Sequence, residues 1–337
     1  MKSKTGIKWS IALFALALTI APLSAGSLKD LFTAATQSNQ DYSVYTLDLE
    51  LAQLKKTKGE IEAKVELDRV NAQNSYASAL ASYRKSVLSF YNEVIDAAFA
   101  AATAELDLEY IGLSLQNAKV DKEYADTRFQ NGLISEEVYK EIDIAYKTVS
   151  NSYDLAAWTL LDAKNVFFLA TGRDWDSSLL PEVPDFSFTA SGEDWLAKDT
   201  GLASAKLAVK IQDLKTASLA TNASAYDKRI QETENLKAKV SLANAESDAK
   251  RSYESMKITL RNQAALLQIR SDEYALEESS FQDGLRQYEK GIISQNDKNQ
   301  KAMALLSVKK ILLAARKNYI KSIGSCLSAL GENPLGL

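Results

Sequence analysis

The chain has 337 residues, a formal net charge of −4, no histidine, one cysteine, four prolines and thirteen glycines. The lack of histidine excludes Ser-His-Asp and Cys-His catalysis, histidine-containing zinc sites and imidazole pH switching. The single cysteine excludes an internal disulfide framework, and the acidic balance gives no basic field for binding nucleic acid.

The N-terminal segment, residues 1–26, has the pattern of a secretory signal peptide. Three lysines precede an apolar run over residues 9–21, and small residues follow it. We expect cleavage after Ala25 or Gly26. An uncleaved membrane anchor is the alternative, but the run is shorter than the roughly 20 residues that a spanning helix needs. We therefore expect an exported protein without a helical anchor.

A single helical register runs over residues 67–129, which contain no proline and only one glycine, Gly112. Its apolar residues are spaced alternately three and four apart, the spacing of a coiled-coil seam. Such a helix would be roughly 95 Å long and must pack along its length on other long helices. Its Ala-rich stretch, residues 97–104, predicts the close approach of a neighbouring helix.

Gly132 ends this long helix, and a second seam follows it over residues 149–170. That seam stops at Gly172, a residue type that favours the C-terminal end of a helix. Residues 173–193 then contain two prolines and are rich in turn signals, so we interpret them as a linker between two halves of the chain.

The two halves are repeats. A shift of 159 positions superimposes both the breaks and the phase of the seam, which predicts duplication of one helical unit. The matching pairs include Gly132 with Gly291, Ser135 with Ser294, and Gly172 with Gly331. We expect a first repeat over residues 27–172 and a second over residues 194–337.

Each repeat is predicted to contain a short helix, a long helix and a return helix. The expected ranges are 28–56, 67–129 and 135–170 in the first repeat, and 194–220, 227–288 and 294–330 in the second. The two shorter helices together match the long helix in length. Stacked end to end beside it, they would form a uniform two-row wall.

The breaks between the long and return helices carry a repeated pattern. The first run is Arg128-Phe129-Gln130-Asn131-Gly132-Leu133-Ile134-Ser135, and the second is Gln287-Tyr288-Glu289-Lys290-Gly291-Ile292-Ile293-Ser294. They resemble the R-[FY]-x-x-G-[LIV]-x-[ST] tip motif of the TolC family of outer-membrane efflux proteins. The duplication agrees, and the resemblance covers nearly all of the chain beyond the signal peptide.

The resemblance implies an all-α, TolC-like helical tunnel protomer with two tandem repeats of long antiparallel coiled-coil helices. It implies a homotrimer whose twelve helical strands close a periplasmic tunnel, located in the outer membrane or periplasm. A membrane-fusion adaptor would grip the tunnel tip and work with an inner-membrane transporter. The conduit would be passive.

The tip residues are the candidates for contact with that adaptor: Gly132, Leu133, Ser135, Gly291, Ile292 and Ser294. The alternative is that they only form the turn of a helical hairpin, where glycine relieves the backbone constraint.

Acidic residues near the tips are candidates for the tunnel entrance. The resemblance places Asp297 there, and three copies would form an anionic ring that favours cations. Glu136 and Glu137 are a weaker counterpart in the first repeat. The alternative for each is a solvated surface carboxylate.

The chain departs from the family in its membrane strands, which are short or missing. A spanning strand needs about 9 to 11 residues, whereas the alternating runs over residues 61–67 and 236–242 are shorter and charged. We interpret both runs as charged helix, which leaves membrane contact open. The alternative function is therefore a barrel-less periplasmic coiled-coil structural or spacer protein.

An enzymatic function has little support in the sequence. It contains no phosphate-binding glycine loop, metal-ligand cluster or nucleophile motif. The carboxylates fall at helical surface spacing beside lysine and arginine, where ion pairs and solvation explain them. We expect no cofactor, no metal, no nucleic-acid partner and no enzymatic activity.

Overall fold

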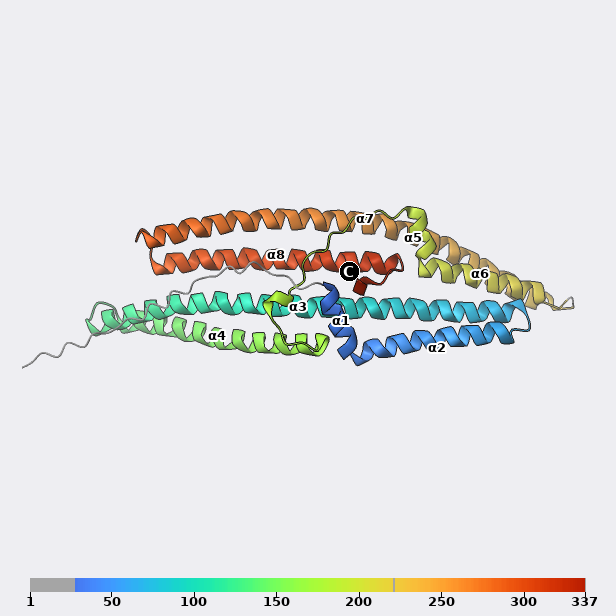
Figure 1. Ribbon diagram of the computed structural model, residues 1–337, viewed down its shortest axis with the longest axis horizontal. Coiled ribbons are helices and arrows are strands. Elements are labelled where there is room, and N and C mark those ends of the chain that lie inside the picture. Colours follow the sequence, from blue (N-terminus) through green and yellow to red (C-terminus); the bar gives the residue numbers. More distant parts are fainter. Residues whose placement is uncertain (1–27, 221, 337) are drawn as a thin grey trace, which may run out of the picture.

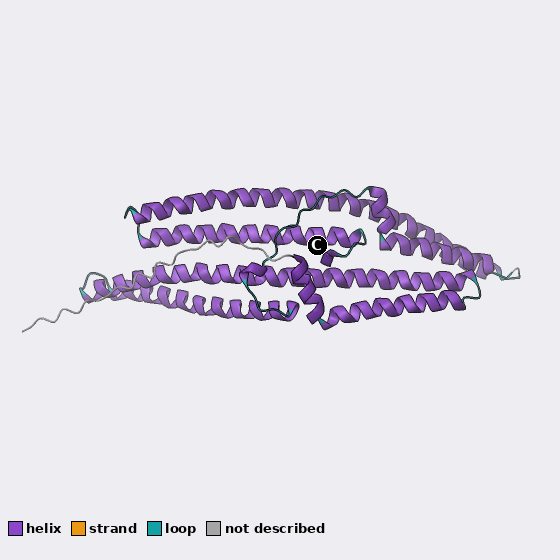
Figure 2. Cartoon of the chain, in the orientation of Figure 1, coloured by secondary structure: helices purple, strands orange, loops and turns teal. Residues whose placement is uncertain are grey.

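The computed structural model describes residues 28–220 and 222–336, so the predicted signal peptide lies outside the described residues. This part of the chain is helical and contains no strand element (Figure 2). Its elements are α1 (Leu28–Ser38), α2 (Gln40–Glu62), α3 (Glu66–Gln130), α4 (Glu136–Thr171), η1 (Ser177–Leu179), α5 (Gly192–Lys198), α6 (Thr200–Ser218), α7 (Ala225–Glu289), α8 (Gln295–Ala329) and η2 (Pro334–Gly336).

The helices form an elongated wall of four rows (Figure 1). Helices α3 and α7, with 65 residues each, are about 98 Å long at 1.5 Å per residue. Helices α2 and α4 stack end to end beside α3, and α6 and α8 stack end to end beside α7. Because α3 also packs against α6 and α8, the order across the wall is α2/α4, α3, α6/α8, α7.

The duplication predicted from the sequence is present in the helices. The first residues of α7 and α8, Ala225 and Gln295, each lie 159 positions after the first residues of α3 and α4, Glu66 and Glu136. The predicted ranges of the long and return helices are correct to within two residues at each end. The all-α fold of two tandem repeats is thus confirmed.

The predicted short helices, 28–56 and 194–220, are wrong as single helices. The first is broken at Asn39 and the second at Asp199. The side chain of Asn39 accepts a hydrogen bond from the Tyr42 N–H at 3.0 Å, and Asp199 accepts one from the Leu202 N–H at 2.7 Å. Both residues act as N-caps. Their side chains accept hydrogen bonds from N–H groups that a continuous helix would pair with backbone carbonyls.

The two alternating charged runs have different structures. Residues 236–242 lie inside α7, as the interpretation of charged helix requires. Residues 61–67 instead contain the turn between α2 and α3, so the helical prediction fails for that run. The Asp68 carboxylate accepts hydrogen bonds from the Lys64 and Val65 N–H groups, at 3.2 and 3.4 Å, and so caps the start of α3.

The main hydrophobic core lies at mid-length, where α1 and the linker cover α3. The ring of Phe32 stacks on Tyr91 with centroids 4.9 Å apart, and the Tyr91 hydroxyl donates a 2.9 Å hydrogen bond to the Ile320 carbonyl of α8. Gly324 provides the space for this ring on α8. The two repeats are therefore joined through a buried tyrosine.

Substitution Gly324→Ala tests this joint. A Cβ at Gly324 would lie 2.2 Å from Tyr91 Cε1, so the free energy of unfolding should fall by about 1–3 kcal/mol. The control is Gly112→Ala, where the nearest atom, in Tyr153, would be 3.5 Å away. We expect that change to stabilise the helix by up to about 1 kcal/mol. Equal denaturation midpoints for the two variants would contradict the tight fit at Tyr91.

Candidate functional site: the hairpin tips and the free edges

The two long hairpins turn at the same end of the wall, at the left of Figure 1. Gly132 and Gly291 each have φ of 69°, a left-handed conformation that suits glycine. The Leu133 N–H donates to the Arg128 carbonyl at 2.8 Å, and the Ile292 N–H donates to the Gln287 carbonyl at 2.9 Å. Both tips are therefore Schellman turns, and the glycines are explained by backbone geometry.

The serines that follow the glycines are helix caps. Ser135 Oγ accepts a hydrogen bond from the Val138 N–H at 3.3 Å, and Ser294 Oγ accepts one from the Asp297 N–H at 3.1 Å. Each satisfies a backbone donor that would otherwise have no partner in the first turn of α4 or α8.

The apolar tip residues have no such structural explanation. The side chain that follows the glycine in a Schellman turn commonly packs back on the helix, but Leu133 is 65% exposed and Ile292 is 67% exposed. The residues that they would cover, Arg128 and Gln287, are polar. The turns therefore do not require an apolar side chain here, and both tips present one to solvent.

Asp297 has a structural role at the start of α8, where it pairs with the capping residue Ser294. Its carboxylate accepts hydrogen bonds from the Ser294 hydroxyl at 2.7 Å and the Ser294 N–H at 3.0 Å. These bonds hold the pKa of the Asp297 carboxyl below its usual value, so this exposed group is ionised at neutral pH.

The first-repeat carboxylates lie on the other hairpin, at the start of α4. Glu136 and Lys140 form an ion pair at 2.7 Å with both side chains largely exposed, and Glu137 is also exposed. Within one chain the structure thus distributes the three predicted entrance residues over two tips.

Sequence reasoning missed a cluster of amide side chains that joins α3 to α8 near the tips. Asn299 is only 1% exposed, and its Nδ2 donates to Asn117 Oδ1 at 2.8 Å. Gln295 donates to Asn299, and Asn296 donates to Asp121. The run of amides just after Ser294 was the available signal. Asn299 is buried only because the other repeat packs against it, and the sequence does not show how the two repeats pack.

The outer face of α7 carries an apolar stripe. Its members are separated by 4, 18, 11 and 7 residues, each close to a whole number of helical turns, so they share one side of the helix. All are more than half exposed: Leu236, Val240, Ile258, Ile269 and Leu276. The buried residues of α7, including Leu260 and Phe281, lie on the opposite side.

The other edge of the wall, formed by α2 and α4, carries a matching stripe. Its exposed apolar residues point away from the contacts with α3: Val44, Leu47, Leu51 and Leu54 on α2, and Ile144, Leu155, Trp158 and Leu169 on α4. Exposed apolar surface of this extent marks an interaction site. The chain thus has two apolar edges, one on each side of the wall.

Neither a membrane-spanning helix nor a metal-binding cluster is present among the described residues. None of their helices is both long and apolar enough to cross a bilayer. They also contain no group of three or more histidine, cysteine, aspartate or glutamate residues placed to hold a metal ion.

Comparison with solved structures shows the same fold in outer membrane channels. The CmeC outer membrane channel of Campylobacter jejuni has 12% sequence identity and a TM-score of 0.59, over 94% of this chain and 87% of that one. The MtrE outer membrane channel of Neisseria gonorrhoeae has 12% identity and a TM-score of 0.57, over 91% and 89%. The outer membrane protein VceC of Vibrio cholerae has 12% identity and a TM-score of 0.54, over 88% and 96%.

The chain therefore has the helical tunnel fold of the TolC-family channels. At these identities the likeness concerns the fold. No protein-family model matches the sequence, and no curated protein matches it.

The capping role of Asp297 generates a pH-dependent prediction. Because its folded-state pKa is depressed, the carboxylate stabilises the protein above its unfolded pKa of about 3.9, and this contribution is lost as pH falls through the folded pKa. Asp297→Asn should therefore lower the melting temperature at pH 7, and the difference from wild type should shrink on acidification.

The matched control is the same change made in a Ser294→Ala background. If the carboxylate acts through the capping box, Asp297→Asn should there have a much smaller effect at pH 7. An undiminished effect, or a difference from wild type that does not depend on pH, would contradict this role.

Proposed function

We propose that the chain is the protomer of a homotrimeric, TolC-like efflux tunnel. It acts as a passive conduit in the outer membrane or periplasm, together with a periplasmic adaptor and an inner-membrane transporter. The mature protomer consists of the repeats 27–172 and 194–337, joined by the linker 173–193.

The pair of apolar edges on opposite sides of the wall supports this assembly. Helix α7 has 65 residues, and α2 and α4, with 23 and 36 residues, form an edge of similar length. The α7 edge of one copy can therefore cover the α2/α4 edge of the next. Such a head-to-tail contact repeats around an axis and forms a closed ring when the rotation closes.

Three copies of a four-row wall supply twelve rows around the axis. The curved, closed arrangement removes every free apolar edge, whereas a dimer or an open chain of copies would leave some exposed. Burial of apolar area drives this assembly, at about 25 cal/mol per Å² removed from water. The likeness in fold to outer membrane channels supports a tube rather than a flat array.

The tips provide the proposed adaptor contact. In a ring, every copy presents both hairpin turns at one end, so Leu133 and Ile292 form a circle of six exposed apolar side chains. The glycines and serines shape the turns and caps, and the apolar residues supply the docking surface. A contact of this kind needs no chemistry by the tunnel itself.

Asp297 is the proposed charged residue of the entrance, with Glu136 and Glu137 as a second acidic set. Three ionised Asp297 carboxylates around the axis would favour cations at the opening. Because the carboxylate is held by Ser294, its position is fixed relative to the tip.

Assembly through the edges can be tested by single charges placed in the stripes. Leu276→Asp on α7 or Trp158→Asp on α4 should convert the wild-type trimer largely to monomer, because each would desolvate a charge in the contact. Leu133→Asp at the tip is the matched control and should leave the trimer intact. Light scattering measures the oligomeric mass of the three variants. Loss of the trimer in all three, or in none, would contradict the edge-to-edge contact.

The entrance proposal can be tested by conductance. Wild-type trimers in a planar bilayer should conduct ions with a preference for cations, and Asp297→Asn should weaken that preference and the block by multivalent cations. Glu136→Gln should have a smaller effect. Unchanged selectivity in Asp297→Asn would remove the entrance ring, and soluble trimers without conductance would support the spacer function instead.

A further inference from the structure

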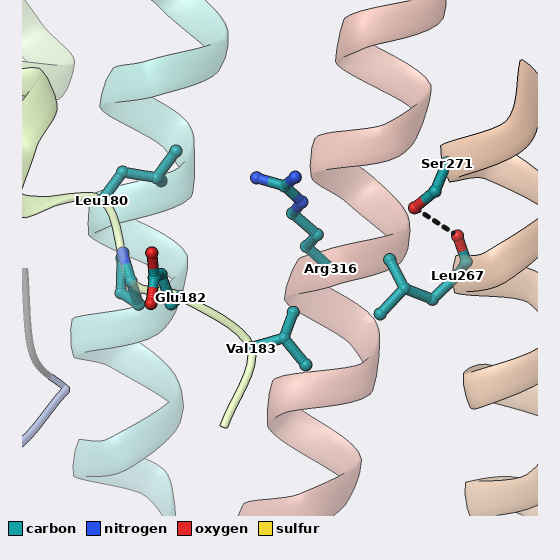
Figure 3. Close-up of a pocket in the computed structure, with 7 residues that line it drawn as sticks. Leu180, Glu182, Val183, Leu267, Ser271 and Arg316 are labelled. Carbon is teal, nitrogen blue, oxygen red and sulfur yellow. Dashed lines mark hydrogen bonds between the residues drawn. The ribbon is translucent and has the colours of Figure 1, made fainter. Parts of the chain in front are cut away.

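A cavity of about 360 Å³ lies where the linker crosses α7 and α8. It is lined by linker residues from Leu180 to Val183, by Leu267 and Ser271 of α7, and by Arg316 of α8. Figure 3 shows the Arg316 side chain extending from α8 toward Leu180 and Glu182. The hairpin tips and the edge stripes described above contribute no residue to this cavity.

Arg316 has no partner among the described residues, unlike three of the lysines near it on α8. Lys310 pairs with Asp107, and both Lys317 and Lys321 pair with Asp96. Arg316, which is partly buried, forms no hydrogen bond or ion pair with any described residue. A partly desolvated guanidinium without an acceptor is unfavourable, so an anion in the cavity would be stabilised there.

Among the described residues that line the cavity, Arg316 is the only cation. The Ser271 hydroxyl donates a 2.9 Å hydrogen bond to the Leu267 carbonyl, so its proton is already used (Figure 3). Glu182 lines the cavity but forms no ion pair with Arg316. The positive charge of Arg316 also opposes the rise in the pKa of Tyr274 that burial causes.

The chemistry of the lining selects a class of ligand. A guanidinium matches the planar carboxylate with two parallel hydrogen bonds. Leu180, Val183 and Leu267 provide an apolar wall for a short hydrocarbon part, and the volume is near the lower end for small-molecule pockets. The negative charge of Glu182 disfavours a second negative charge on the ligand.

We propose that this cavity binds a small organic monocarboxylate, with Arg316 as the residue that binds its carboxylate group. The ligand is a free small molecule. An aspartate or glutamate side chain from a second copy of the chain would also supply a carboxylate to Arg316. The experiment below distinguishes this contact from binding of a free small molecule. The proposal does not depend on the channel function, so each can fail without the other.

The test uses butyrate as the probe and the purified full chain, with binding followed by ligand-observed NMR. Butyrate should bind, and its neutral isostere butyramide should not. Arg316→Gln should weaken butyrate binding at least tenfold. Arg270→Gln is the matched control, because it removes an arginine one turn from Leu267 that is already paired with Glu273 at 2.6 Å, and it should bind butyrate as wild type does.

A second variant tests the selectivity. Glu182→Gln should allow the dianion succinate to bind about as well as butyrate, whereas wild type should prefer butyrate. Circular dichroism of each variant establishes that it is folded. Equal binding of butyrate by wild type and Arg316→Gln would overturn the proposal. So would absence of butyrate binding together with a changed oligomer size in Arg316→Gln, a result that would assign Arg316 to a contact between copies.

Discussion

A helix of 65 residues, such as α3 or α7, cannot bury its own apolar residues. An isolated helix of this length has solvent on every side, so each apolar stripe needs a neighbour along its whole length. Within the chain, α3 satisfies this need because rows pack on both of its sides, whereas α7 and the α2/α4 row each lie at an edge. The apolar stripes of these two edges therefore have no covering helix within one copy.

The connection between the two repeats follows from the same packing problem. Alanines over residues 97–104 of α3 bring its neighbours close, and Tyr91 reaches across to the backbone of α8 where Gly324 makes room. Ion pairs of Asp96 and Asp107 with lysines of α8 border this contact. Toward the tips the joint becomes polar, with Asn299 buried among amides, so the two hairpins meet there through hydrogen bonds.

The sequence predicts the long helices well because their signals are local and repeated. A coiled-coil seam with few glycines or prolines predicts the helices. Gly132 and Gly291 indicate the tips, because a left-handed turn at the end of a helix favours glycine. The breaks at Asn39 and Asp199 were missed because a capping side chain is also compatible with a helix interior. The Arg316 cavity could not be predicted, since it exists only where the linker crosses residues more than eighty positions away.

In the proposed trimer, the two apolar edges close on each other in a ring of three copies. The most direct measurement is the mass of the purified protein by light scattering, in buffer and in detergent. A closed ring of three copies should have three times the mass of the chain without its predicted signal peptide, and that chain is somewhat lighter than the 37.0 kDa of the full sequence. A monomer in both conditions would contradict it, because the edge stripes of α7 and α2/α4 would then remain in water.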